Sequence, residues 1–405
     1  MPTIGLVLPT SSYRGPDFVA AAAELGIDLV VASDASLGFV SGRILDVVIV
    51  DCTDPAAAAD ALVERSRAYP LDAVVGVDDA GVMTAALASE QLGLPHNDPA
   101  SVAATRDKFT MRRLLAKGAV AQPTFEELEA GGSAITAAAA IGFPLVVKPV
   151  SLSGSRGVIR VENESELTVA VTRIRAIQTE AGVAGERLLL EEYLPGPEIA
   201  LEGLVSAAGL EVLAIFDKPD PLDGPFFEET LYVTPSSHPE PLLGEVATLV
   251  EEAAHALGLA FGPIHAEVRL TPSGARIIEV AARSIGGLCG RSLKFGMLSQ
   301  SLEILLLRAA LGMNRRGMRI AGHASGAMMI PIPADGVLRA VHGREAVAEV
   351  HGIEEITITV PIGRRIRPLP EGDRYLGFII ARGDDPQAVG DSLREAHDLL
   401  AIEIE

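Results

Sequence analysis

The first 92 residues alternate short apolar runs with longer amphipathic segments. Apolar runs at 4–8, 28–32, 47–50 and 73–77 predict strands, and the intervening segments at 17–25, 55–68 and 80–92 predict helices. Repeated strand–helix units of this kind predict an open parallel sheet with helices on both faces. Ligands of such sheets bind beyond the carboxyl ends of the strands. Ser11, Ser12, Asp78 and Asp79 fall at these ends, as substrate-side residues or simply as helix caps.

After residue 118 the pattern changes to apolar runs typical of antiparallel strands. The predicted strands are at 143–149, 158–161, 187–194, 199–205 and 212–216, and the predicted helices are at 107–117, 165–180, 241–257 and 299–311. Short strands at 324–332, 354–360 and 376–381 and a helix at 386–400 follow residue 314. The chain therefore divides into an α/β unit, 1–118, and two α+β units, 119–313 and 314–405.

Two acidic residues, Glu267 and Glu279, lie on adjacent predicted strands of a hairpin. Polar and apolar residues alternate from His265 to Leu270, and a turn-rich segment at 271–275 separates them from a second strand. A five-residue loop centred on Ser273 places Glu267 opposite Glu279, where like charges destabilise a sheet unless a cation lies between them. The pair is thus either a Mg²⁺ site or an exposed face with two solvated acids, and a register slip of one residue removes the metal interpretation.

Composition narrows the classes of function. The 405 residues carry 54 acidic and 33 basic side chains, a net charge of −21, which argues against a general nucleic-acid or membrane-surface binder. The two cysteines, Cys52 and Cys289, build neither a zinc site nor a disulfide framework. The start of the sequence has no signal-peptide pattern and no apolar stretch is long enough to span a membrane, so we expect a cytoplasmic protein.

Several motifs combine residues that could bind a nucleotide. Lys148 ends an apolar strand and precedes the loop SGSRG, whose glycines let backbone N–H groups approach phosphate oxygens, although a flexible hairpin with a solvated lysine has the same sequence. EEYLPGPE, ending at Glu198, offers a broken strand edge for a purine and an acid for ribose, or an ordinary strand end. Arg283 follows the second acid by four residues and suits a phosphate or a surface ion pair. We interpret His265 as a hydrogen-bonding scaffold group.

In this order the motifs resemble the ATP-grasp superfamily, and within it the carboxylate–amine ligases. The motifs are Lys108 in TRDKFTMRRLLAKG, Lys148 in VVKP, the loop SGSRG, EEYLPGPE, HAEVRL and IIEVAARSIGG. The resemblance covers roughly residues 1–310, and the tail resembles the C-terminal domain of L-amino-acid (dipeptide) ligases. It implies a Rossmann-like domain over 1–118, an ATP-grasp domain over 119–313 and a small C-terminal domain over 314–405. Within the ATP-grasp domain it implies a lid at about 120–190 and a metal-binding subdomain at about 191–313.

The resemblance also implies roles for individual residues. Lys108 and Lys148 would contact ATP phosphates, and Arg283 would stabilise an acyl-phosphate. Glu228 or Glu229 would meet a substrate amino group. The remaining implied contacts are the loop residues Ser153, Gly154, Ser155 and Gly157 over the phosphates, Glu191, Tyr193 and Leu194 at adenine, Glu198 at ribose, and Glu267 and Glu279 at Mg²⁺, or Mn²⁺ in its place.

One position departs from the pattern. Many relatives have Asn two residues after the second metal-binding Glu, where this sequence has Ala281, so a second metal ion would have fewer protein ligands.

The implied activity is ATP-dependent activation of a carboxylate, that of an amino acid, and its ligation to an amine, with release of ADP and phosphate. A carboxylase or purine-pathway ligase and a non-catalytic nucleotide-binding module remain alternatives. The substrates are small molecules, and a homodimer is compatible with the superfamily.

Overall fold

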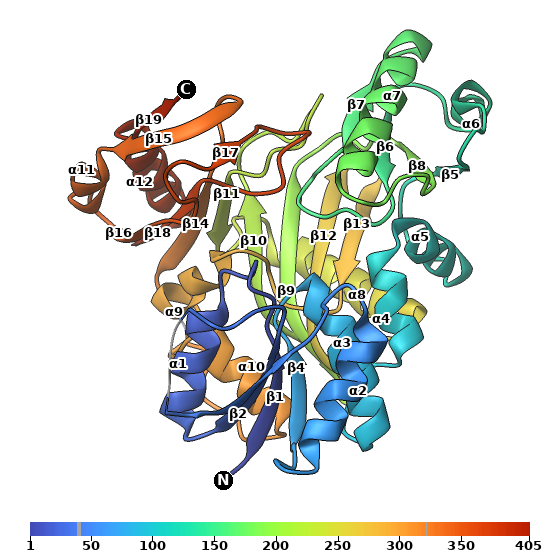
Figure 1. Ribbon diagram of the computed structural model, residues 1–405. Coiled ribbons are helices and arrows are strands. Elements are labelled where there is room, and N and C mark those ends of the chain that lie inside the picture. The colour runs from blue at the N-terminus through green and yellow to red at the C-terminus, as the bar shows by residue number, and fades with distance from the viewer. Residues whose placement is uncertain (39–41, 321) are drawn as a thin grey trace.

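A parallel sheet with helices on both faces forms the N-terminal part of the computed structural model, which describes residues 1–38, 42–320 and 322–405 (Figure 1). The strand order is β3-β2-β1-β4, and all three pairings are parallel. Its elements are β1 (Thr3–Val7), α1 (Gly15–Leu25), β2 (Asp28–Ser33), β3 (Ile44–Ile49), α2 (Pro55–Ser66), β4 (Ala73–Gly76) and α3 (Asp79–Leu92). Ile4 and Leu6 face one hydrophobic cluster while Val7 faces another, so this sheet is buried on both faces, as predicted.

A small antiparallel sheet, which we call the lid, follows two connecting helices, α4 (Pro99–Arg106) and α5 (Lys108–Lys117). The strand order in the lid is β5-β8-β6-β7. Its elements are β5 (Phe125–Leu128), α6 (Ala134–Ile141), β6 (Leu145–Pro149), β7 (Ile159–Val161), α7 (Glu164–Glu180) and β8 (Leu188–Glu192). Helices α6 and α7 pack on this sheet through a separate hydrophobic cluster, so the lid is a structural unit with its own core.

One sheet of eight strands runs from the hairpin of Glu267 and Glu279 into the C-terminal part of the chain. The strand order is β13-β12-β9-β10-β11-β14-β18-β16. The strands are β9 (Glu198–Ser206), β10 (Gly209–Lys218), β11 (Leu231–Thr234), β12 (Gly262–Thr271), β13 (Gly274–Ala281), β14 (Ala324–Ile330), β16 (Ile353–Ile358) and β18 (Gly377–Gly383). Helix α8 (Glu240–Leu257) packs on this sheet, and η1 (Cys289–Ser292), α9 (Leu293–Gly296) and α10 (Leu302–Ala310) lead from it back to the N-terminal sheet. The short strand β11 was not predicted, and it joins the two halves of the sheet.

The C-terminal part adds a second, three-stranded sheet of order β17-β15-β19. Its elements are β15 (Gly336–His342), α11 (Arg344–Ala348), β17 (Arg365–Ile366), α12 (Pro386–Asp398) and β19 (Ala401–Ile404). Helix α12 covers the face of the eight-stranded sheet to which Met328, Ile330 and Ile379 point. The opposite face of the same strands therefore points toward the centre of the molecule.

The lid contacts the C-terminal part through the segment between β17 and β18. The backbone N–H of Gly157 donates to the carbonyl of Pro370 at 2.9 Å. Arg173 of α7 donates twice to Glu371, at 2.6 and 2.9 Å, and Arg367 makes a two-point ion pair with Glu180. The lid is thus closed over the large sheet in this structure. None of the helices in the described part of the chain has the length and apolar character that crossing a membrane requires.

Candidate active site

The two acids of the hairpin do face each other, although the predicted turn is wrong. Glu267 pairs with Glu279 across β12 and β13, as predicted. The connection, however, is a two-residue turn, Pro272 and Ser273, and not a five-residue loop at 271–275. Near this turn the register differs by one from the predicted register, and a β-bulge that skips Ile278 restores it before Glu279. The two errors cancel at the position that matters.

A buried arginine from another element holds this bulge. Arg112 of α5 is fully buried and donates to the carbonyls of Ile277 and Ile278 at 3.1 and 2.6 Å. Its Nε also donates to Glu191 Oε1 at 2.6 Å. The same carboxylate accepts from Lys148 Nζ through its second oxygen, at 2.6 Å. Burial opposes the charged form of Glu191, but the two cations outweigh it and lower the pKa of that carboxyl, whereas burial lowers the pKa of Lys148.

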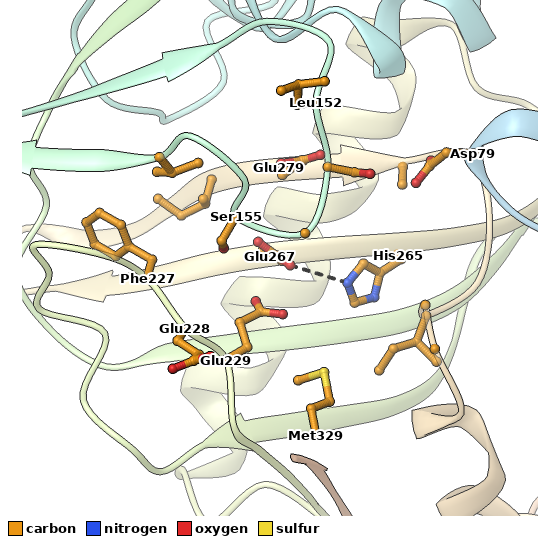
Figure 2. A pocket seen from close by; sticks show the side chains of 18 of the residues that line it. Asp79, Leu152, Ser155, Phe227, Glu228, Glu229, His265, Glu267, Glu279 and Met329 are labelled. Atoms are coloured by element: carbon orange, nitrogen blue, oxygen red, sulfur yellow. Dashed lines mark ion pairs between the residues drawn. The ribbon is translucent and has the colours of Figure 1, made fainter. Parts of the chain in front are cut away.

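The other predicted phosphate-binding lysine lies beside the second acid of the hairpin. Lys108 Nζ lies 3.4 Å from Glu279 Oε2 and donates to the carbonyl of Leu152 at 2.8 Å. Leu152 begins the glycine-containing loop, and Gly154, Ser155 and Gly157 of that loop have φ angles of 63°, 56° and 74°. A left-handed backbone is costly at Ser155. This conformation turns the loop over the cavity, where Figure 2 shows Leu152 and Ser155 above Glu267.

A lysine that the sequence analysis missed lies among three carboxylates. Lys218 Nζ is 2.7 Å from Glu198 Oε1 and 3.3 Å from Glu267 Oε1, and it also donates to Glu229. These three carboxylates offer oxygens within 4.8 Å of one another. Tyr232 donates to the second oxygen of Glu229 at 3.0 Å. Burial raises the pKa of Glu229 to about 7. Lys218 opposes this shift, and the neighbouring acids add to it.

Glu198 is held from two sides at the strand end where ribose binding was predicted. Besides Lys218, it accepts from Arg269 at 2.8 Å, and Arg269 also donates to the carbonyls of Gly196 and Leu222. Tyr193 and Leu194 line the same cavity, next to a small apolar cluster of Val146, Leu222 and Phe227. The predicted adenine residues therefore adjoin an apolar part of the cavity, which we call the apolar slot.

Arg283 is held by the N-terminal sheet. Its Nε lies 2.8 Å from Asp79 Oδ1, at the start of α3. Burial opposes the charge of the guanidinium, but Asp79 outweighs burial and raises the pKa of Arg283. The loop that follows is fixed by Arg14, which donates to Ser284 Oγ at 2.7 Å and pairs with Glu303 at 2.6 Å. Asp79, one of the acids predicted at the sheet's carboxyl ends, thus orients a predicted functional residue.

His265 is confirmed as a hydrogen-bonding group between two acids. Its Nδ1 contacts Glu202, whose other oxygen accepts from the backbone N–H of Ile285, and its Nε2 lies 3.6 Å from Glu267 Oε1 (Figure 2). Burial lowers the pKa of the imidazole, but Glu202 and then Glu267 outweigh it and raise that pKa to about 9.

This raised pKa predicts a pH dependence of stability in the chain free of metal and nucleotide. A pKa of about 9 in the folded state, against 6.5 for histidine in the unfolded chain, means that the folded chain holds an extra proton between these values. The contribution of His265 is therefore complete below pH 6.5 and is lost as the pH rises through 9, by about 3 kcal/mol in total. We expect His265→Gln to flatten the fall in unfolding free energy over this range, measured by urea titration. The exposed His351→Gln is the control, and an unchanged slope in His265→Gln would contradict the assignment.

All the predicted site residues but Gly157 line one cavity of about 330 Å³. The lining residues among them are Lys108, Lys148, Ser153, Gly154, Ser155, Glu191, Tyr193, Leu194, Glu198, Glu267, Glu279 and Arg283. Ser11, Ser12, Asp78, Ala281, Glu228 and Glu229 line it too. Gly157, at the end of the loop, does not line the cavity, and its backbone N–H donates to the carbonyl of Pro370.

Models of three protein families match consecutive parts of the chain. Residues 19–96 match the ATP-grasp N-terminal domain, 141–292 the ATP-grasp domain, and 328–405 the L-amino acid ligase C-terminal domain 2. The crystal structure of an L-amino acid ligase from Bacillus licheniformis superposes with a TM-score of 0.84 over 100% of this chain and 99% of that chain, at 25% identity. The chain belongs to the ATP-grasp superfamily. Its class is that of ATP-dependent carboxylate–amine ligases.

Curated relatives of this ATP-grasp chain are distant in sequence. An uncharacterized protein, y4rH, of Sinorhizobium fredii is 24% identical over 93% of this chain and 78% of its own length. Dapdiamide A synthase of Enterobacter agglomerans is 24% identical over 84% of this chain and 82% of its own length. Several other ligases match over only 28–53% of their own length. N5-carboxyaminoimidazole ribonucleotide synthetase of Thermotoga maritima, at 16% identity and a TM-score of 0.75, covers all of both chains and shares the fold.

The donor set of this ATP-grasp site fits a hard divalent cation. Glu267 and Glu279 supply carboxylate oxygens from paired strands, and Mg²⁺ is usually bound by one or two carboxylates plus substrate phosphates. In this structure each acid is neutralised by an ammonium group instead, Glu267 by Lys218 and Glu279 by Lys108. The acids are therefore already arranged around positive charge. Ala281 is buried and adds no ligand, as the sequence indicated.

Proposed function

We propose that this chain uses ATP to activate the carboxylate of an amino acid as an acyl-phosphate and joins it to an amine, giving a dipeptide or similar amide, ADP and phosphate. The observation that carries the proposal is that one cavity gathers the groups that this reaction needs. It is lined by the apolar slot beside Tyr193 and Leu194, by the lysines and acids, by Arg283 and by a second apolar end. A nucleotide would occupy the part lined by the motif residues, and the second apolar end would take another molecule.

The phosphate end has residues suited to hold and shield the transferred group. We propose that Lys108 and Lys148 bind ATP phosphates and that Ser153, Gly154, Ser155 and Gly157 close over them. Phosphoryl transfer depends on positioning and on neutralising spread negative charge, which two lysines provide. Closure excludes water, which would otherwise hydrolyse the acyl-phosphate. A Mg²⁺ ion held by Glu267 and Glu279, or Mn²⁺ in its place, would supply further charge neutralisation.

The nucleoside end has a more specific division of roles. Tyr193 and Leu194 border the apolar slot, in support of adenine binding, and Glu198 lies at the position proposed for ribose. Both oxygens of Glu191 are paired with Arg112 and Lys148. We therefore propose that Glu191 acts at the nucleotide chiefly by positioning the Lys148 ammonium.

Between the two candidates for the substrate amino group, the contacts favour Glu229. Figure 2 shows its carboxylate directed toward Glu267 and His265, while that of Glu228 points away from them. Among the described residues Glu228 has no hydrogen-bond or ion-pair partner, and burial raises its pKa. An ammonium group at Glu229 would adjoin the acyl-phosphate site at Arg283.

The experiment that tests the proposed function measures phosphate release from ATP with panels of amino acids, amines and bicarbonate. Amine-dependent phosphate release with an amide product by mass spectrometry supports the proposal. Stimulation by bicarbonate and not by amino acids would favour a carboxylase on the same scaffold. ATP binding without turnover under any condition would favour a nucleotide-binding module, and amine-dependent formation of AMP would exclude acyl-phosphate chemistry.

A further inference from the structure

The cavity has a second apolar end that the nucleotide-binding motifs do not explain. Its lining residues belong to the large central cluster and not to the cluster beside Tyr193. They come from four separate segments of the chain and are Tyr13, Cys289, Met329, Tyr375 and Phe378. Figure 2 shows Met329 on the opposite side of Glu229 and Glu267 from Leu152 and Ser155, so these acids lie between the glycine-containing loop and Met329.

The wall of this end is a rigid sheet face. Met329 of β14 and Phe378 of β18 are direct cross-strand partners. Both point to the central cluster, whereas their chain neighbours Met328 and Ile379 point to the cluster under α12. Tyr13 and Tyr375 pack edge-on against Phe378, with ring centroids 5.7 and 6.5 Å apart. Paired strands and interlocked rings of this kind fix the shape of the end.

The segment that carries Arg283 also borders this end. Gly287 has a φ of +59°, and a Cβ at that position would lie 2.6 Å from the ring of Phe378. Glycine therefore allows the backbone after Arg283 to pass directly against the aromatic wall. Arg283, Gly287 and Cys289 all line the cavity. A carboxylate bound at Arg283 thus has its substituents within the space that this wall encloses.

The chemistry of the end favours an apolar occupant. The arginines nearby already have partners: Arg374 pairs with Asp373 at 2.7 and 2.8 Å, and Arg14 pairs with Glu303. An acidic substituent would lose its hydration there without gaining an ion pair. Within the described part of the chain the hydroxyl of Tyr375 makes no hydrogen bond, so it can accept or donate one to a polar atom at the rim.

We propose that this second apolar end binds the side chain of the amino acid whose carboxylate is activated, and that it selects bulky apolar side chains such as those of leucine, methionine and phenylalanine. The inference rests on the proposed ligase function and names its substrate class. Full burial of such a side chain favours leucine over alanine by about 10- to 150-fold in kcat/KM. We expect the kcat/KM for aspartate to fall below that for alanine.

The experiment measures phosphate release by the full-length wild-type chain with ATP, Mg²⁺, a fixed amine and each amino acid in turn. The position of each residue in the product is read by mass spectrometry. A Met329→Trp variant fills the end, and we expect the ratio of kcat/KM for leucine to that for alanine to fall at least 10-fold, while the KM for ATP changes little. Met313→Trp, at an exposed position outside the cavity, is the control.

The outcomes separate this inference from the proposed function. A wild-type enzyme that ligates amino acids but prefers small or charged ones overturns the inference and leaves the function intact, and so does a Met329→Trp variant with an unchanged preference. If none of the amino acids stimulates phosphate release, the proposed function and the inference are overturned together. Since the wild-type preference alone can overturn the inference, failure of the variant to fold leaves it testable.

Discussion

Replacing Lys218 with methionine is expected to lower the free energy of unfolding by about 3–5 kcal/mol in the absence of metal and nucleotide, because removing one partner of a buried ion pair leaves uncompensated charge. Only 2% of the Lys218 side chain is exposed, and its ammonium group contacts Glu198, Glu229 and Glu267. Methionine has a similar length but no charge. The three carboxylates, within 4.8 Å of one another, would then repel each other in a buried site.

Mg²⁺ should restore part of the lost stability of Lys218→Met, since a divalent cation can replace the ammonium group and binding to the folded state raises the melting temperature. Protonation should act in the same direction. The pKa of Glu229 is already about 7, above its unfolded value, so its contribution is lost as the pH rises through 7. Calorimetry at pH 6 and 8, with and without Mg²⁺, measures both effects. Lys294→Met, at an exposed lysine, is the control, and an unchanged melting temperature in Lys218→Met would contradict the charge arrangement.

The sequence predicted the facing acids better than the structure around them. Glu267 and Glu279 oppose each other because the bulge at Ile278 offsets the unexpectedly short turn. The short turn and the compensating bulge were not predictable from the hairpin, because the carbonyls at the bulge are bound by Arg112, 165 residues earlier in the chain. An arginine in an amphipathic helix gives no sequence signal that it is buried.

Lys218 was missed for a related reason. At the end of an apolar strand a lysine has the pattern of a solvated terminus. Its burial depends on the pairing of β10 with β9, which places Lys218 opposite Glu198. It also depends on Glu229, which lies in the loop before β11. The useful signal was the excess of acids at one end of neighbouring strands, which requires a cation. Contacts between the lid and Glu371 or Pro370 likewise join segments about 200 residues apart, and only the folded chain brings them together.

The domain boundaries predicted at 118 and 313 stay predictions. The helices and strands on each side of them agree with the expected α/β and α+β classes. However, β14, β16 and β18 extend the same sheet that contains Glu198 and Glu267, through the unpredicted strand β11. This continuity explains why residues after 314 reach the cavity at all, and it makes the C-terminal part a wall of the substrate end.

Arg283→Lys is expected to lower kcat by about 10²–10³-fold while changing the KM for ATP little, because a guanidinium aimed at developing charge acts mainly in the transition state. Asp79 holds the Nε of Arg283 at 2.8 Å and the carbonyl of Ser284 accepts from its Nη1 at 3.0 Å, while Arg283 lines the cavity. Lysine keeps the charge, but its single nitrogen cannot replace a planar guanidinium that is held at two points. Steady-state kinetics of phosphate release measure the change, and Arg276→Lys, on the preceding strand β13, is the control. An Arg283→Lys variant with unchanged kcat and a raised KM for the amino acid would instead assign this arginine to substrate binding, since uniform binding alters KM alone.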